Sequence, residues 1–360
     1  MQIYNQTRYV SEFTQGMEPT GREFLSLVIK GTFDFPPAAG APLRPSKDQR
    51  ALVMADEFTG DPGFSATLWE TDFAFRKSRC DVILQGSAYS PGGKPAERVR
   101  VGLKIGAWSK MFDVIGHREW VNLGLKPVPT HPHPFVRQPF SYDTAYGGTD
   151  HLDPENETPD SYPANPVGTG WSDGRNPSKL PGLPLPNTQA IGEEISSPYG
   201  DYTPVSFGPV GRGWPKRLPY AGTYDQNWID NIFPFLPSDF DERYYQSAPE
   251  DQQIAPPATG TEVVILNLTP NGREAFRLPE TSLPITVFRR RDIAFEGTSQ
   301  PDTLLFDTEA RTFSMVWRID VPIHRIITEF TEAWIGLPTR GMLRARATGK
   351  KYVRGMSEPA

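Results

Sequence analysis

The chain has 360 residues, a formal net charge of −6, 37% hydrophobic residues and 22% charged residues. This length allows one large domain or two ordinary ones, and it is sufficient to bury a core. The acidic balance argues against a dedicated nucleic-acid-binding protein, in which basic residues usually gather on one face. Proline and glycine are abundant, at 38 and 32 residues, but eight Trp, 13 Tyr and 21 Phe argue against a disordered chain.

Cysteine content and apolar runs indicate the compartment. The one cysteine, Cys80, excludes an intrachain disulfide and a cysteine-based zinc site, and it fits a reducing environment. The first residues lack the basic start and apolar stretch of a signal peptide. The apolar runs, such as residues 263–266, are far shorter than the ~20 residues that span a bilayer. We therefore expect a cytoplasmic protein.

The first zone, residues 1–125, has the patterns of β-strands. Residues 24–29 form a short apolar run typical of a buried strand. At residues 99–105, Val, Leu and Ile alternate with Arg, Gly and Lys, which is the period of a strand with one face in the core. Residues 81–89 also favour a strand, and Ser-Pro-Gly-Gly at 90–93 supplies a turn. These two strands together predict a β-hairpin.

The middle zone, residues 127–260, contains 23 of the 38 prolines, so long helices or strands are not expected there. It also contains Trp171, Trp214, Trp228 and most of the tyrosines, which a flexible linker would lack. We predict an ordered, loop-rich region with short turns that packs onto the strands.

The third zone, residues 261–338, again has the patterns of strands. Segments 261–268 and 274–278 flank Pro-Asn-Gly, and the Asn-Gly pair favours a hairpin turn. Residues 313–321 alternate apolar with mostly polar side chains, which predicts a strand with one solvent-exposed face. Ile326, Phe330 and Trp334 are spaced by four residues, which indicates a short helix.

These patterns predict a mainly β protein, with a sandwich-like or barrel-like body, a long ordered region rich in Pro, Gly and aromatic residues, and a few short helices. Neither strand zone alone has enough strands for a sandwich. We therefore expect zones 1–125 and 261–338 to share one core in a single domain, 1–338, with residues 127–260 as an insert. Residues 339–360 are expected to form a basic, solvated tail, and its cations are Arg340, Arg344, Arg346, Lys350, Lys351 and Arg354.

Signatures of catalysis and metal binding are weak. The chain has no Gly-x-Ser-x-Gly elbow, no phosphate-binding loop and no His-Glu-x-x-His motif. His131, His133 and His151 lie near one another or near carboxylates. Prolines flank His133, however, and the acidic run around His151 lacks the spacing of a calcium loop. We interpret these histidines as surface residues and predict no metal ion and no other cofactor.

Asp225, Asp239 and Asp241 leave an enzyme open as an alternative. Two carboxylates roughly 5–10 Å apart beside aromatic rings would resemble a glycosidase cleft. In a region with many turns, short acids more often accept hydrogen bonds from nearby backbone N–H groups. We favour this capping role and predict no catalytic residue, and a carbohydrate-active enzyme is the alternative.

A series of motifs in a fixed order extends through most of residues 20–290. It comprises DVILQG at 81–86, VGLKIG at 101–106, VIGHREW at 114–120, PFSYDTAYGG at 139–148, NPVGTG at 165–170, FGP at 207–209, WPKR at 214–217, AGTYD at 221–225, Trp228, PFLPSDFD at 234–241 and APEDQQ at 248–253. This series resembles the bacterial family known as domain of unknown function 2169. His117 and Tyr146 depart from the family pattern.

The resemblance implies a cytoplasmic adaptor or chaperone associated with type VI secretion. Such a protein would bind a toxic effector, often one with a PAAR-repeat domain, and help to load it onto the VgrG spike. Catalysis, a cofactor, nucleic acid and a membrane are not implied. A structural component that is fired with the spike is a further alternative.

Exposed Trp, Tyr and Arg side chains dominate protein interfaces, because a rigid ring buries much area with few torsions to freeze. The aromatic middle zone is therefore the expected binding region. The residues that we predict to contact the partner are Trp214, Arg217, Tyr224, Asp225, Trp228, Asp239 and Asp241.

Overall fold

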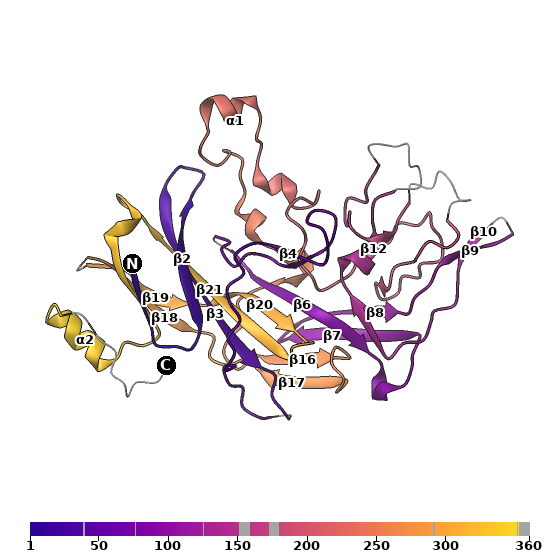
Figure 1. The fold of residues 1–360 in the computed structure, drawn as a ribbon, viewed down its shortest axis with the longest axis horizontal. Coiled ribbons are helices and arrows are strands. Elements are labelled where there is room, and N and C mark those ends of the chain that lie inside the picture. The colour runs from indigo at the N-terminus through magenta and orange to yellow at the C-terminus, as the bar shows by residue number, and fades with distance from the viewer. Residues whose placement is uncertain are drawn as a thin grey trace.

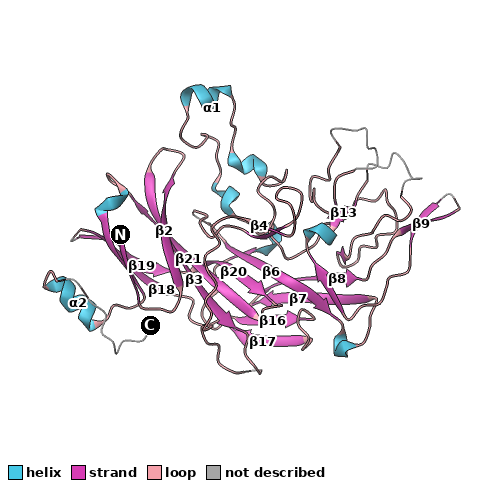
Figure 2. Ribbon diagram, in the orientation of Figure 1, coloured by secondary structure: helices cyan, strands magenta, loops and turns pink. Residues whose placement is uncertain are grey.

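The computed structural model describes residues 1–360 except residues 39, 76, 125, 151–158, 173–179, 291, 351 and 353–360. Three large sheets make up the body, and loop-rich segments lie along one side of them (Figures 1 and 2). The prediction of a mainly β protein is confirmed, and no sheet in the described part of the chain closes into a barrel.

The largest sheet has seven strands, in the order β11-β6-β20-β21-β3-β2, and β15 also pairs with β6. β3 and β21 pair antiparallel along the whole of β21, and β6 pairs in parallel with β20. Strands from the two ends of the chain are therefore neighbours in one sheet. The bounds are β2 (Val10–Met17), β3 (Glu23–Asp34), β6 (Cys80–Tyr89), β11 (Arg137–Phe140), β15 (Gln253–Ile254), β20 (Pro301–Asp307) and β21 (Thr312–Pro322).

A five-stranded antiparallel sheet has the order β14-β8-β7-β16-β17. The predicted hairpin around Asn271 and Gly272 is confirmed, since β16 and β17 pair antiparallel. Its loop is longer than a two-residue turn, and Asn267 and Gly272 both take positive φ angles. The bounds are β7 (Arg98–Ile105), β8 (Trp108–Ile115), β14 (Thr188–Gln189), β16 (Glu262–Leu266) and β17 (Arg273–Arg277).

The main core lies between these two sheets. Phe313 of β21 stacks on Phe33 of β3, Phe306 of β20 and Phe276 of β17, with ring centroids 5.2, 5.7 and 5.3 Å away. All four rings are buried. Because large rings contribute most of the apolar area in a core, this stack joins the two sheets as a sandwich.

A four-stranded sheet, in the order β1-β22-β18-β19, completes the body. Its strands are β1 (Gln2–Asn5), β18 (Leu283–Arg289), β19 (Asp292–Ser299) and β22 (Phe330–Ile335). Helix α2 (Arg340–Ala347) packs on it through the buried Met342, which lies with Phe288 and Trp334. The Arg346 guanidinium lies 3.4 Å from the centre of the Phe288 ring. The segment predicted as a solvated tail thus begins with a packed helix, while Lys351 and Arg354 are outside the described residues.

Residues 127–260 contain only short elements, as their proline content predicts. No helix in the described residues is long and apolar enough to cross a bilayer. The remaining elements are the strands β4 (Glu57–Phe58), β5 (Thr67–Trp69), β9 (Trp120–Leu123), β10 (Lys126–Pro129), β12 (Tyr146–Gly147) and β13 (Thr169–Gly170), the helix α1 (Gln226–Asn231), and the 3-10 turns Pro91–Gly93, Tyr142–Thr144, Leu218–Ala221, Glu242–Tyr245, Glu250–Gln252 and Ile327–Glu329.

The hairpin predicted from segments 81–89 and 99–105 is wrong. Both segments are strands, but β6 lies in the seven-stranded sheet and β7 in the five-stranded sheet. The turn at 91–93 carries the chain from one sheet to the other across the core. Alternation shows that a strand has a buried face, but it does not say which strand lies beside it.

The short helix predicted from Ile326, Phe330 and Trp334 is limited to the 3-10 turn at 327–329, and residues 330–335 form β22 instead. A spacing of four residues is an even number, so it also places side chains on one face of a strand. Phe330 and Trp334 are both buried in that strand, where β22 pairs with β18 and β1.

The expected solvent-exposed face of β21 is in fact covered. Ser314 is buried and its hydroxyl lies 2.9 Å from that of Thr32. The Arg318 side chain is buried too, where it pairs with Asp302 and donates to the Asp72 backbone oxygen. The loop segment before β6 lies over this face, so Ser314 and Arg318 are satisfied by protein groups.

Buried ion pairs connect the covering loops to the sheet. Lys30 of β3 pairs with Asp72 at 2.8 Å, and Lys77 pairs with Asp81 of β6 at 2.7 Å. Asp81 also accepts hydrogen bonds from the Ser247 backbone N–H and the Gln246 amide, at 2.8 and 2.7 Å. The end of the middle region is therefore fixed to β6 by a buried carboxylate.

Candidate interaction site

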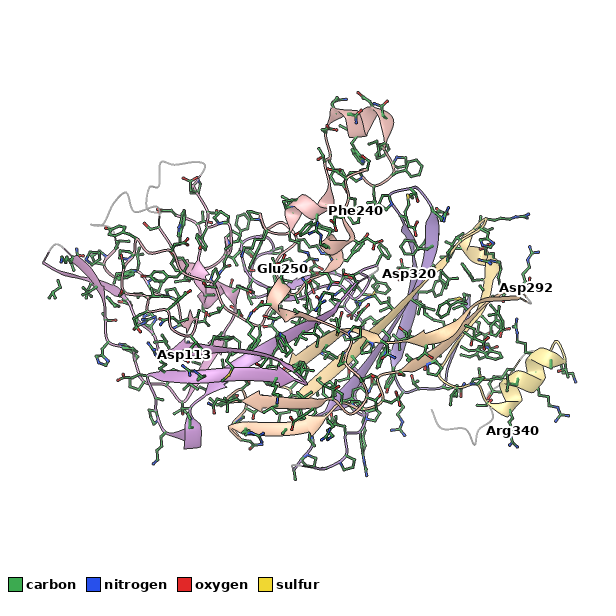
Figure 3. The ribbon with its side chains drawn as sticks, turned by 180° about the vertical axis from the view of Figure 1, so that it is seen from behind. Asp113, Phe240, Glu250, Asp292, Asp320 and Arg340 are labelled. Atoms are coloured by element: carbon green, nitrogen blue, oxygen red, sulfur yellow. The ribbon has the colours of Figure 1, made fainter. Side chains whose placement is uncertain are left out.

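An arm, residues 222–240, projects from the body and carries α1 at its tip (Figures 1 and 2). Seen from behind, Phe240 lies at the base of the arm and Glu250 lies close to that base (Figure 3). On one side, the arm contacts the turn between β2 and β3, since a Cβ atom on Gly21 would lie only 3.0 Å from the Phe235 ring.

The arm is held in shape by its own side chains. Asp225 caps α1, because its carboxylate accepts a hydrogen bond of 2.8 Å from the Trp228 backbone N–H. The Trp228 indole donates to the Phe235 backbone oxygen at 2.9 Å. The Trp228 ring also packs edge-on against Tyr224 and Phe233, with centroids 4.7 and 5.5 Å away. Trp228 is thus the internal support of the arm.

Two acids close the base of the arm. Asp239 accepts hydrogen bonds from the Thr223 backbone N–H and hydroxyl, at 3.0 and 2.7 Å, and these bonds lower the pKa of Asp239. Asp241 accepts hydrogen bonds from the Arg243 side chain and backbone, which lower the pKa of Asp241. Arg243 in turn lies 4.3 Å from the centre of the Tyr220 ring.

The capping role favoured for these acids is confirmed, since Asp225, Asp239 and Asp241 each accept a hydrogen bond from a nearby backbone N–H. A lowered pKa keeps Asp239 and Asp241 ionised at neutral pH, whereas the general acid of a glycosidase has a raised pKa. The arrangement of these three carboxylates therefore gives no specific support to the carbohydrate-active alternative.

Gly222 allows the sharp turn at the start of the arm. Its backbone φ and ψ angles are 82° and −178°, a combination that residues other than glycine rarely adopt. A Cβ atom at this position would lie 2.7 Å from the Pro237 Cβ and 2.9 Å from an Asp239 carboxylate oxygen.

We therefore expect Gly222→Ala to destabilise the base of the arm by about 1–3 kcal/mol, because it adds both backbone strain and a clash. Hydrogen exchange at residues 222–240 should accelerate more than exchange in the sheets. Gly213→Ala is the matched control, since a Cβ atom there has nothing within 4 Å. Equal exchange in the two variants would contradict this account of the turn.

The arm exposes four large apolar side chains among polar ones. Tyr224, Ile229, Phe233 and Phe235 are 53, 56, 66 and 43% exposed. Scattered exposed apolar residues are ordinary, but four of them on one short projecting segment are a concentration of the kind that often marks an interaction site. The name "apolar tip" is used below for these four residues.

The residues predicted to bind a partner fall into two groups. Tyr224, Asp225, Trp228 and Asp239 belong to the arm, and Asp241 lies directly after it. Trp214 and Arg217, in contrast, are buried at 6 and 3% exposure, so neither side chain offers a binding surface in this structure.

Trp214 and Arg217 pack the middle region onto the body. The Trp214 ring lies edge-on to Tyr142, with centroids 5.3 Å apart. Arg217 pairs with Glu70 and donates to the backbone oxygens of Val210 and Tyr244. An arginine with all of these acceptors is saturated, and its role is to hold loops together.

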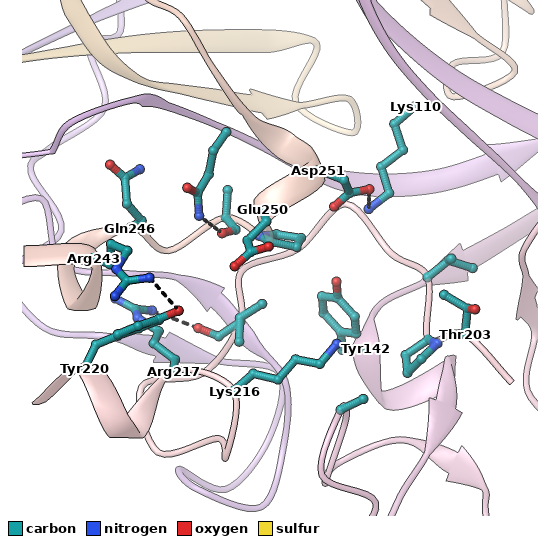
Figure 4. A pocket seen from close by; sticks show the side chains of 17 residues that line it. Lys110, Tyr142, Thr203, Lys216, Arg217, Tyr220, Arg243, Gln246, Glu250 and Asp251 are labelled. Carbon is teal, nitrogen blue, oxygen red and sulfur yellow. Dashed lines mark hydrogen bonds and ion pairs between the residues drawn. The ribbon is translucent and has the colours of Figure 1, made fainter. Parts of the chain in front are cut away.

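A pocket of about 540 Å³ opens next to the base of the arm (Figure 4). Tyr220 and Arg243, which lie at that base, form part of its wall. Apolar residues contribute much of the rest, among them Ala164, Pro204, Val205, Val210, Ala248 and Pro249. Its volume is within the range of pockets that bind drug-sized ligands.

Most charged groups around the pocket are already paired. Lys110 pairs with Asp251 at 2.8 Å and donates to the Gln252 amide oxygen at 2.6 Å. Burial lowers the pKa of Lys110, although Asp251 opposes that shift. Arg217 is paired with Glu70 and Arg243 with Asp241, as described above. No ion pair joins Lys216 or Glu250 to a described residue, although Glu250 adds to the rise in the pKa of Arg243 that Asp241 mainly causes.

The four described histidines do not form a metal centre. In the described part of the chain, no group of three or more His, Cys, Asp or Glu side chains is placed to hold a metal ion. The rings of His117 and His133 lie 5.8 Å apart, and His117 is paired with Glu119 at 3.0 Å. His131 lies near Glu97, while His151 is outside the described residues.

The model of one protein family, described as "Uncharacterized protein conserved in bacteria (DUF2169)", matches residues 20–318. The chain belongs to the DUF2169 family. The matched region begins before β3 and ends within β21, so it includes the arm and the pocket. No curated protein and no solved structure matches the chain.

Sequence reasoning missed part of the site in this DUF2169 chain. Ile229, Phe233 and Phe235 of the apolar tip were not among the predicted residues, and neither were Lys110, Tyr142 and Lys216 of the pocket. The run Phe-Pro-Phe-Leu-Pro at 233–237 is a usable signal, because prolines prevent a regular element from burying those apolar side chains.

Proposed function

We propose that this DUF2169 protein is a cytoplasmic adaptor or chaperone that binds a type VI secretion effector and helps to load it onto the VgrG spike. The observation that carries the proposal is the apolar tip on a preorganised, projecting arm. The nature of the partner, an effector that often has a PAAR-repeat domain, comes from the family resemblance of the motif series.

The physical argument for binding starts with the rigidity of the arm. Asp225, Trp228 and Asp239 hold the arm through hydrogen bonds, so little conformational entropy is lost when it binds. Its exposed rings then bury apolar area against a partner, and aromatic residues are enriched in interface hot spots.

We expect the double variant Ile229→Ser, Phe233→Ser to lower the affinity for the effector about 100-fold, since two hot-spot side chains contribute on the order of 3 kcal/mol. Binding of the purified effector would be measured by calorimetry. Because Phe233 packs against Trp228, the single variant Ile229→Ser is measured as well; it should still lower the affinity, and hydrogen exchange at residues 222–240 should stay near that of the unmodified protein, which would show that the arm keeps its shape.

The matched control is Leu337→Ser, Leu343→Ser, which also replaces two exposed apolar residues but lies at and near α2, away from the arm. It should leave the affinity unchanged. Equal loss in both double variants, or no loss in the arm variant, would contradict a binding role for the apolar tip.

Deletion of the gene tests the cellular role. The effector encoded nearby should lose stability or delivery in the deletion strain, and the adaptor itself should stay in the cell. Appearance of this protein in the culture supernatant only when the secretion apparatus is active would favour the alternative of a fired structural component. Unchanged effector stability and delivery would contradict the adaptor proposal.

A further inference from the structure

The pocket beside the arm contains a polar group that the fold does not use. Tyr142 is 5% exposed, and its hydroxyl has no hydrogen-bond partner among the described residues. The hydroxyl points into the pocket (Figure 4). Burial raises the pKa of Tyr142, so the phenol stays protonated and can donate a hydrogen bond. The hydroxyl is accessible from the open pocket, so it is available to donate a hydrogen bond to a molecule bound there.

A second donor lies nearby. The Lys216 side chain extends across the pocket toward Tyr142 (Figure 4). The other cations in the wall, Lys110, Arg217 and Arg243, are each neutralised by a carboxylate. Lys216 is thus the one cation of the wall that lacks an ion-pair partner in the described residues, and its exposed side chain ends beside the Tyr142 ring (Figure 4).

The charged residues of the wall limit which ligands the pocket can bind. Glu250 and Asp251 also line it, so a polyanion such as nucleic acid or a nucleotide would meet two carboxylates. A ligand with a single carboxylate and otherwise neutral polar groups fits better. Lys216 and Tyr142 would hold the carboxylate, and Glu250 would accept from neutral N–H donors.

A polypeptide segment meets these requirements. Its backbone N–H groups match the acceptor Glu250, its apolar side chains match Val205, Val210 and Ala248, and one Asp or Glu supplies the carboxylate. The location adds support, because Tyr220 and Arg243 belong to both the pocket wall and the base of the arm. A protein held by the apolar tip is thus close enough to place a segment in the pocket.

We propose that the pocket binds an extended segment of the partner protein, and that Lys216 and the Tyr142 hydroxyl hold an acidic side chain of that segment. This inference rests on the proposed function, since the partner is the protein that the arm binds. It adds a second contact with a defined chemical preference, which the apolar tip does not have.

The first test measures the affinity of the purified partner for three variants. Lys216→Glu should lower the affinity at least about tenfold, and Tyr142→Phe, which keeps the ring that packs on Trp214, about three- to tenfold. Lys94→Glu makes the same change of charge at an exposed lysine outside the pocket, so it should have no effect. Equal affinity of Lys216→Glu and Lys94→Glu would overturn the inference.

The second test identifies the segment. A photo-reactive benzoylphenylalanine at position 203, in the pocket wall, should cross-link to a partner peptide that contains Asp or Glu. Changing that acid to Lys in the partner should restore binding to the Lys216→Glu variant. Failure of this charge exchange, or a cross-linked segment without an acid, would contradict the assignment of Lys216.

The third test separates the pocket from the proposed function. The probes are the acetylated, amidated pentapeptide Ala-Val-Glu-Val-Ala, its Gln counterpart and free acetate, each titrated into the full chain by NMR. Tighter binding of the Glu peptide, lost in Lys216→Glu, would support the inference even if no effector binds. Equal binding of both peptides, or acetate binding as tightly as the Glu peptide, would overturn the inference about the pocket. The adaptor role would still be decided by the variants of the apolar tip.

Discussion

Replacing Arg217 by alanine is expected to lower the free energy of unfolding by about 3–5 kcal/mol, because it leaves a buried carboxylate without its main cation. Arg217 and Glu70 are both buried, and the second bond of their pair measures 3.0 Å. After the substitution, Glu70 would retain only Arg212, at 3.4 Å. The backbone oxygens of Val210 and Tyr244 would also lose their donor.

Urea denaturation followed by tryptophan fluorescence would measure the loss. Arg243→Ala is the control, since Arg243 is 61% exposed at its side chain and pairs with Asp241 at the surface, where a salt bridge contributes about 1 kcal/mol or less. The double variant Arg217→Met, Glu70→Leu should recover much of the stability, because apolar residues often replace a buried ion pair without loss. A loss below about 1 kcal/mol for Arg217→Ala would refute its structural role.

Phe313→Ala is expected to lower the free energy of unfolding by about 3–5 kcal/mol. The substitution removes the central ring of a four-ring stack and leaves a cavity between the two sheets. The seven-stranded and five-stranded sheets both lose contacts. The unfolding transition should therefore move to a lower urea concentration and remain a single step. Unfolding in urea would again be the measurement.

The control for the core substitution is Phe64→Ala, because Phe64 is almost fully exposed and should change stability by less than about 0.5 kcal/mol. A biphasic transition in Phe313→Ala, with one sheet unfolding before the other, would contradict a core shared by both sheets.

The arm illustrates how far sequence reasoning reaches for the candidate site. Aromatic side chains among prolines predicted contact residues in the middle region 127–260, which stays a prediction, and the capping role favoured for Asp225 is confirmed. Trp214 and Arg217 belong to the same kind of sequence, yet they are buried. The local sequence around Trp214 and Arg217 resembles that of the arm. These two residues are buried because Tyr142 and Glu70, which are distant in the sequence, pack against them.

The pocket could not be predicted at all. Lys110, Tyr142, Lys216 and Glu250 come from four separate segments, and no spacing in the sequence connects them. Their proximity follows from the way in which the middle region folds back on β6 and β8, which is a long-range property of the chain.

By itself the sequence determined the mainly β class, the strands β3, β7 and β21, the β16–β17 hairpin, the proline-rich region without long elements and, through the ordered motifs, the family. These features depend on side-chain period, turn chemistry and backbone restriction, which are local. Strand partners, the covered face of β21, the strand β22 and the burial of Arg217 were decided only by tertiary structure. The reason is that a period of two specifies that a side chain is buried but not what buries it.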